Sequence, residues 1–232
     1  MMARFGCGVP ANIIPLGLYS VFQIGHESIT AALAAGLTRI AILSPADKPH
    51  DLPELESQVE RTNTFLSKLG WGEDQIVILN EHDPDVVETK LYEAAAAEPS
   101  TIKTIATQGG KRDIARLALA TLNKASAEVQ KIIKLAARSP YGRLDIDAKG
   151  CTLCLACVRS CPAGTLSGDQ ERPTLSFNEV ACVQCGLCLA TCPERVIKLD
   201  RRYNITDFVL KPITIREEEP FECISCGKPF GT

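Results

Sequence analysis

Eight of the eleven cysteines in this 232-residue chain fall in two runs with the same spacing. The first run consists of Cys151, Cys154, Cys157 and Cys161, and Pro162 follows it. The second consists of Cys182, Cys185, Cys188 and Cys192, and Pro193 follows it. Every cysteine of the first run has a counterpart 31 residues later. The two runs are therefore an internal duplication of one cysteine-bearing segment.

The chemistry that this spacing favours is the binding of [4Fe–4S] clusters. Three thiolates separated by two residues can wrap a short loop around three corners of an iron–sulfur cube, and the fourth cysteine, which precedes a proline, points away and ligates the other cube. We therefore expect two clusters. Site 1 would consist of Cys151, Cys154, Cys157 and Cys192, and site 2 of Cys182, Cys185, Cys188 and Cys161.

Two other uses of these cysteines fit the spacing less well. Zinc also takes four thiolates, but usually through two C-x2-C pairs that a longer loop separates. A disulfide framework needs an oxidising compartment, and the N-terminus carries no secretory signal, so we expect a cytoplasmic protein with thiols that remain available for metal. Apolar residues between the cysteines are expected to keep water from the clusters: Leu153, Leu155, Val158, Val183, Leu187 and Leu189.

Composition excludes two classes of partner. The formal net charge of −3 leaves no basic footprint, so we expect no nucleic acid. No apolar stretch approaches the ~20 residues that span a bilayer, so we expect no membrane span. No side chain is assigned a catalytic role, and an electron carrier or electron-transfer subunit is favoured over a catalyst.

The first part of the chain alternates short apolar segments with amphipathic ones, which predicts an α/β domain with a parallel sheet and flanking helices. Strands are expected at 11–18, 38–43, 75–79 and 101–107, and helices at 28–35, 51–69, 83–97, 111–123 and 126–137. His26, His50 and His82 lie near expected strand ends and are interpreted as solvated loop residues. Residues 109–112 could hold an anion at a helix start, but a plain loop is favoured.

The predicted domains are 1–138 (α/β, a scaffold or docking domain), 139–204 (a small α+β ferredoxin-like 2[4Fe–4S] domain) and 205–232. In the second domain, strands are expected at 143–147, 174–178 and 196–199. The last segment carries Cys223 and Cys226, which form half of a zinc-ribbon knuckle. The other two zinc ligands could come from another subunit or from a continuation of the chain; alternatively the pair is an unmetallated dithiol or a disulfide.

Three stretches resemble known families. Residues 143–200 resemble the bacterial two-cluster ferredoxins at all eight cysteines and at both prolines. The run that starts Cys182-Val-Gln-Cys-Gly-Leu-Cys and ends Cys-Gly-Lys-Pro-Phe is similar to larger bacterial 4Fe-4S proteins associated with formate dehydrogenase, which suggests that the chain is a fragment. The order of elements in the N-terminal part is similar to the delta subunit of methyl-viologen-reducing hydrogenase. The loops where that family places further cluster cysteines, 16–18 and 44–47, contain none here.

Together these observations predict an iron–sulfur protein that relays single electrons to or from a partner oxidoreductase. The resemblance implies that this partner is a formate dehydrogenase or a hydrogenase-like complex. One alternative is a subunit of a nucleotide- or flavin-dependent redox enzyme, in which the α/β domain holds the second cofactor. Another is a scaffold or maturation factor whose clusters are structural.

Overall fold

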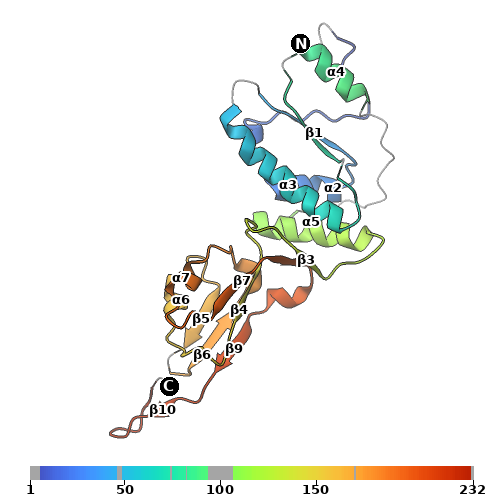
Figure 1. Ribbon diagram of the computed structural model, residues 1–232. Coiled ribbons are helices and arrows are strands. Elements are labelled where there is room, and N and C mark those ends of the chain that lie inside the picture. Colours follow the sequence, from blue (N-terminus) through green and yellow to red (C-terminus); the bar gives the residue numbers. More distant parts are fainter. Residues whose placement is uncertain are drawn as a thin grey trace. The chain divides into compact units, whose positions relative to one another are not determined.

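The computed structural model describes residues 6–45, 49–73, 75–81, 83–93, 107–169 and 171–230 (Figure 1). The chain divides into two compact units, Met1–Gln130 and Lys131–Thr232, and each is described by itself. Within the described ranges, no helix combines the length and the apolar composition that crossing a bilayer requires.

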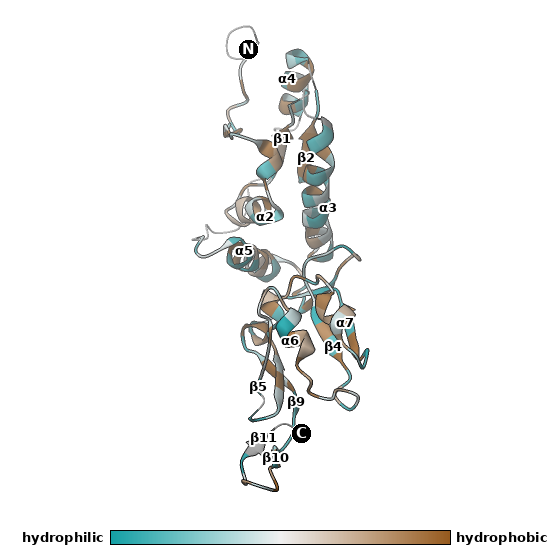
Figure 2. Ribbon diagram, turned by 90° about the vertical axis from the view of Figure 1, so that its left-hand side faces the viewer, coloured by the Kyte–Doolittle hydropathy of each residue, from teal (hydrophilic) through white to brown (hydrophobic). Residues whose placement is uncertain are grey.

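The sheet of the first unit is parallel and, among the described residues, has two strands (Figure 2). β1 (Ile40–Leu43) pairs with β2 (Ile76–Leu79) in a register that places Ile40 opposite Ile76. Between them lie η2 (Pro49–Asp51) and α3 (Leu52–Lys68), so the segment is a β-α-β unit. The predicted parallel sheet with flanking helices is thus matched in part, and the expected strand at 101–107 lies almost wholly outside the described residues.

Helices supply most of the core of the first unit. Besides α3, they are η1 (Val21–Gln23), α2 (His26–Ala34), α4 (Pro84–Glu93) and α5 (Lys111–Ala125). The largest apolar side chains that these helices bury are Ile29, Leu33, Leu55, Phe65, Leu66, Leu119 and Leu122. On α3 the buried positions recur every three or four residues, as the helical repeat requires. Teal and brown residues accordingly alternate along α3 in Figure 2.

Two expected elements are wrong. Residues 11–18 form a turn and an irregular segment, not a buried strand, and the side chains of Ile14 and Leu16 are each 79% exposed. Pro15 has no N–H to give to a sheet, and this contributes to the outcome. Residues 126–137 form no helix, because the Asn123 side chain binds the backbone N–H and C=O of Gln130 just after α5 ends. The β-branched pair Ile132-Ile133 lies instead in a strand.

The second unit repeats one strand–helix–strand pattern. In the first copy, β4 (Arg143–Ile146), α6 (Ala156–Ser160) and β5 (Leu166–Asp169) follow one another. In the second copy, β6 (Thr174–Phe177), α7 (Leu187–Thr191) and β7 (Ile197–Asp200) begin and end 31 residues later. The duplication seen in the cysteines therefore extends to the strands and α-helices around them.

The two copies exchange strands. β4, the first strand of copy one, pairs antiparallel with β7, the last strand of copy two, and β5 pairs with β6 in the same way. Two backbone bonds continue this exchange: the N–H of Asp147 donates to the C=O of Val196 (3.0 Å), and that of Asn178 to the C=O of Thr165 (2.8 Å). Neither copy thus completes its own sheet.

Further strands extend the unit beyond the duplication. β3 (Ile132–Lys134) pairs with β8 (Arg202–Asn204), and β9 (Ile213–Glu217) adds to β6 after η4 (Asp207–Leu210). A short hairpin of β10 (Phe221–Glu222) and β11 (Pro229–Phe230) follows. One buried apolar cluster of this unit draws on both copies: Leu144, Leu155, Leu166, Leu175, Phe177 and Ile197.

His26 is buried at the start of α2, so its interpretation as a solvated loop residue is wrong. Its Nδ1 lies 2.9 Å from Oε1 of Gln58 and 3.4 Å from Nη1 of Arg61 on α3. Burial lowers the pKa of His26, with Arg61 and Arg112 acting in the same direction and the Gln58 hydrogen bond and Glu27 in the other. His50 is exposed, and His82 lies outside the described residues.

This burial predicts a pH dependence of stability in the first unit. The pKa of His26 in the folded chain lies below the ordinary histidine value of about 6.5, so the unfolded chain binds more protons as the pH falls through 6.5. We expect the free energy of unfolding to have its full value above that pH and to decrease as the pH falls below it. Urea unfolding at pH 7.5 and 5.5 can be followed by fluorescence of Trp71, the single tryptophan, whose Nε1 donates to Leu122.

A matched pair of variants separates His26 from other titrating groups. His26→Gln should reduce the difference in unfolding free energy between the two pH values, whereas His50→Gln, at an exposed position, should leave it as in the wild type. An unchanged pH dependence in His26→Gln would show that another group causes it.

Candidate iron–sulfur centre

Two cavities in the second unit are lined by cysteines. One has an empty volume of about 350 Å³, including open solvent, and Cys151, Cys154, Cys157 and Cys192 line it. The other has an empty volume of about 320 Å³ on the same measure, and Cys161, Cys182, Cys185 and Cys188 line it. Each cavity thus brings together three cysteines of one copy and the fourth cysteine of the other.

The cysteines surround a space and do not meet at a point. Within the described residues, no three Cys, His, Asp or Glu side chains come close enough together to hold a single metal ion. Thiol donors on several walls of a largely apolar cavity fit a cofactor of several atoms, such as an iron–sulfur cube, which needs one thiolate at each iron. The residues present therefore fit the [4Fe–4S] cofactor that the sequence predicts.

The backbone that carries the cysteines repeats an unusual conformation. Leu153 and Gln184 occupy equivalent positions in the two copies, and their φ angles are 55° and 56°. Leu155 (55°) and Gly186 (81°) form a second equivalent pair with positive φ. Such left-handed turns are rare for residues other than glycine, and they persist only where surrounding structure or function requires them. Here they curl each loop so that its three cysteines line one cavity.

Some of the apolar side chains that were predicted to surround the clusters lie at the cavities or in the core beside them. Leu155 is buried, and Leu153 and Val158 are partly buried against the core of the unit. Val183 lines the site 2 cavity, although its side chain is also exposed. Leu187 and Leu189 are exposed on α7 and line neither cavity, so the prediction that they shield the clusters is not matched.

Burial changes the acidity of the inner thiols. It raises the pKa of Cys157 to about 11 and also raises that of Cys188, in both cases with help from neighbouring cysteines. At Cys161 burial acts to raise the pKa, but hydrogen bonds from Thr165 and nearby backbone N–H groups outweigh it, and the pKa is lowered. Since iron binds the thiolate, occupation of these sites must release protons.

Two cysteine sulfur atoms have side-chain hydrogen-bond partners that the sequence interpretation missed. Nε2 of Gln184 donates to Sγ of Cys182 over 3.4 Å and to the C=O of Arg143 over 3.2 Å. The hydroxyl of Thr165 lies 3.2 Å from Sγ of Cys161. Both cysteines line the site 2 cavity. A comparison of the two copies position by position could have flagged these polar residues, because Leu153 and Val196 occupy the equivalent positions.

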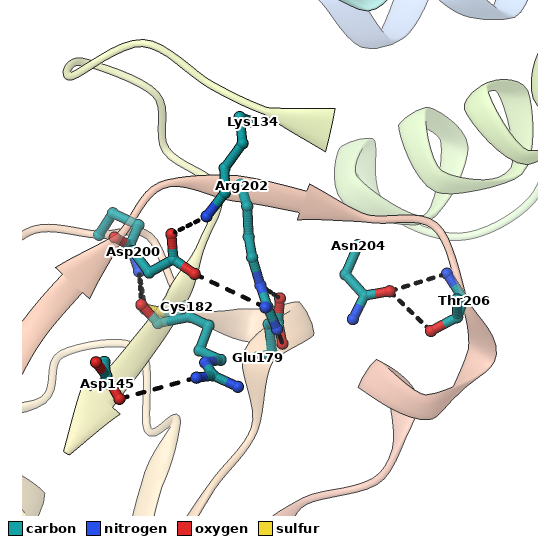
Figure 3. Close-up of polar contacts among 10 residues, drawn as sticks. Lys134, Asp145, Glu179, Cys182, Asp200, Arg202, Asn204 and Thr206 are labelled. Atoms are coloured by element: carbon teal, nitrogen blue, oxygen red, sulfur yellow. Dashed lines mark hydrogen bonds and ion pairs between the residues drawn. The ribbon is translucent and has the colours of Figure 1, made fainter. Parts of the chain in front are cut away.

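An arginine holds the segment that leads into each cysteine loop, and the sequence interpretation missed both. Nη1 of Arg216 on β9 donates to the backbone C=O of Ala148 and, over 3.3 Å, to that of Lys149. Glu179, the equivalent of Ala148 in the second copy, accepts two bonds from Arg202 on β8, of 2.9 and 2.7 Å (Figure 3). Both arginines follow the duplicated segment in the chain.

The remaining cysteines lie elsewhere. Cys223 and Cys226 lie on the turn of the β10–β11 hairpin, where the N–H of Cys223 donates to Lys228 (2.9 Å) and that of Gly227 to Cys223 (2.8 Å). Backbone N–H groups of Ser225 and Cys226 lower the pKa of Cys223. Cys7 is exposed in the first unit, and its backbone contacts Glu88 and Tyr92.

Comparison with known families agrees with this geometry. A family model described as a 4Fe-4S dicluster domain matches residues 150–197. No curated protein matches the chain. The matched segment contains both cysteine loops, α6 and α7, so it is a ferredoxin-like 4Fe-4S segment that binds an iron–sulfur cofactor. The match supports a role in electron transfer.

Proposed function

We propose that this protein relays single electrons through two [4Fe–4S] clusters, one at site 1 and one at site 2. The observation that carries the proposal is the pair of cavities, each lined by four cysteines drawn from both copies of the duplication. When bound, each cluster exchanges one electron between its 2+ and 1+ states. Two such sites in one small unit suit a relay, whereas stabilising the fold requires only one.

The residues of the chain hold and insulate the cofactors and perform no acid–base chemistry. The thiolates supply four ligands at each site, and the inner cysteines, Cys157 and Cys188, are buried. Cys154 and Cys185 are exposed, so each site has one edge near the solvent. An electron can therefore enter or leave at either exposed edge, while the apolar core keeps bulk water from the remaining ligands.

The proposed partner is a redox protein, for which the sequence resemblance suggests a formate dehydrogenase or a hydrogenase-like complex. Bound clusters with four thiolates each are anionic, so a docking partner should present Lys or Arg around its own redox centre. We also propose that Cys223 and Cys226 supply two of the four ligands of a zinc ion, with the other two contributed by another subunit or by a continuation of the chain. The hairpin turn that carries both cysteines and the lowered pKa of Cys223 support this second site.

The test of the relay is anaerobic purification followed by iron and sulfide analysis and by EPR after reduction with dithionite. We expect about eight iron atoms per chain and a spectrum of two interacting reduced clusters. Zinc in place of iron, or clusters that dithionite cannot reduce, would contradict electron transfer and favour a structural role. Zinc analysis of Cys223→Ser/Cys226→Ser tests the hairpin site separately, because that variant should lose zinc and keep its iron.

A further inference from the structure

The two cluster sites are built from duplicated segments but are not chemically equivalent. Equivalent positions that line the cavities hold Gln184 at site 2 and Leu153 at site 1, and likewise Thr165 at site 2 and Val196 at site 1. In both pairs the side chain at site 2 has a hydrogen-bond donor and its counterpart has none. At both positions, therefore, site 2 has a hydrogen-bond donor that site 1 lacks.

Both donors point at ligand sulfur atoms from fixed positions. Gln184 is 5% exposed, and its amide is oriented because Nε2 donates both to Arg143 and to Sγ of Cys182. Thr165 is 4% exposed, and its hydroxyl lies 3.2 Å from Sγ of Cys161. Once iron binds the sulfur, that atom carries no proton, so the hydroxyl must be the donor.

From this asymmetry we propose that Gln184 and Thr165 raise the reduction potential at site 2 above that at site 1, so that a single electron comes to rest at site 2. The proposal rests on the proposed function, since it requires both sites to hold clusters. Reduction adds one negative charge, which spreads over the ligand sulfur atoms. A donor that faces such a sulfur favours the reduced form and so raises the potential.

Other differences between the sites are weaker or oppose one another. Glu194 lines site 1 and its counterpart Ala163 lines site 2, but Glu194 is exposed, and its neighbour Arg195, also exposed, carries the opposite charge. Thr152 at site 1 is the counterpart of Val183 at site 2, and Thr152 is exposed. Cys182 at site 2 is buried, whereas its counterpart Cys151 at site 1 is partly exposed. Burial of this ligand would by itself lower the reduction potential at site 2. The buried donors act directly on the ligands and are expected to outweigh this single change.

The experiment is an anaerobic redox titration of the full chain followed by EPR. The wild type should show two potentials. Thr165→Val and Gln184→Met remove a donor with little change of size, and each should lower the higher potential and leave the lower one in place. The reciprocal variant Leu153→Gln should raise the lower potential, whereas its size-matched control Leu153→Met should not.

Two results for these variants would overturn the ordering of the sites. The donors would not order the sites if Thr165→Val and Gln184→Met left both potentials unchanged. Site 1 would be the higher-potential site if these variants lowered the lower potential instead. Fewer than two clusters in the wild type would contradict the proposed function, and the ordering would fall with it; two clusters with unresponsive potentials would contradict only the ordering.

Discussion

Replacing Cys154 and Cys192 together should cost the protein one cluster, whereas replacing Cys154 and Cys161 together should cost it both. Cys192 lines the same cavity as Cys154, while Cys161 lines the other one. Each alanine substitution removes one of four ligands, so we expect about four iron atoms per chain in Cys154→Ala/Cys192→Ala and close to none in Cys154→Ala/Cys161→Ala. Iron and sulfide analysis of anaerobically purified variants measures this directly.

The same pair of variants discriminates between the two possible ligand assignments. If each run kept its own fourth cysteine, the results would be reversed, and Cys154→Ala/Cys161→Ala would retain about four iron atoms. Cys7→Ala is the matched control for loss of a thiol outside the sites, and it should retain the iron content of the wild type. Because cluster binding and folding are coupled, the variant that loses both clusters should also lose most of the stability of the second unit.

Arg202→Gln should destabilise the second unit by ~3–5 kcal/mol, because it leaves the carboxylate of Glu179 buried without its partner. The side chains of Arg202 and Glu179 are 11% and 13% exposed and are joined by two hydrogen bonds (Figure 3). The hydrogen bond to Glu179 raises the pKa of Arg202, so this side chain stays charged at any working pH. Anaerobic urea unfolding, followed at the cluster absorption, gives the change.

A neighbouring ion pair provides the control. Lys134 binds Asp200 over 2.8 Å, but the Lys134 side chain is 73% exposed, so Lys134→Gln should cost less than ~1 kcal/mol. The double variant Glu179→Gln/Arg202→Gln should be more stable than the sum of its single variants predicts, since it removes both buried charges. If Arg202→Gln and Lys134→Gln lowered the free energy of unfolding by the same amount, the buried pair would contribute little to stability.

The duplicated part of the fold could be predicted because its signals are local. The expected strands at 143–147, 174–178 and 196–199 correspond to β4, β6 and β7. In the first unit, the pattern of apolar residues predicted strands at 38–43 and 75–79 and a helix at 51–69. These ranges lie close to the observed limits of β1, β2 and α3. Predictions failed where a single side chain redirects the chain, as at Gln130, whose backbone N–H and C=O the Asn123 side chain binds so that no helix forms there.

The polar surroundings of the candidate site could not be predicted from spacing. Cysteine spacing specifies which loops carry the thiols, but it does not state which other side chains reach the sulfur atoms. Gln184 reaches Cys182 because the left-handed backbone at position 184 turns its side chain into the cavity and because Gly142 leaves room for its amide. Arg202 and Arg216 lie beyond the last cluster cysteine, and only the strand pairing brings them back to the cysteine loops.

The exchange of strands between β4–β7 and β5–β6 has a consequence for the ancestry of the unit. A single copy of the repeat would carry three cysteines for one cofactor and a fourth for another, with half of each sheet missing. Two identical peptides could satisfy one another through the same pairings around a two-fold axis. Gene duplication and fusion of such a homodimer would produce the arrangement of the present chain, in which the two copies differ at Gln184 and Thr165.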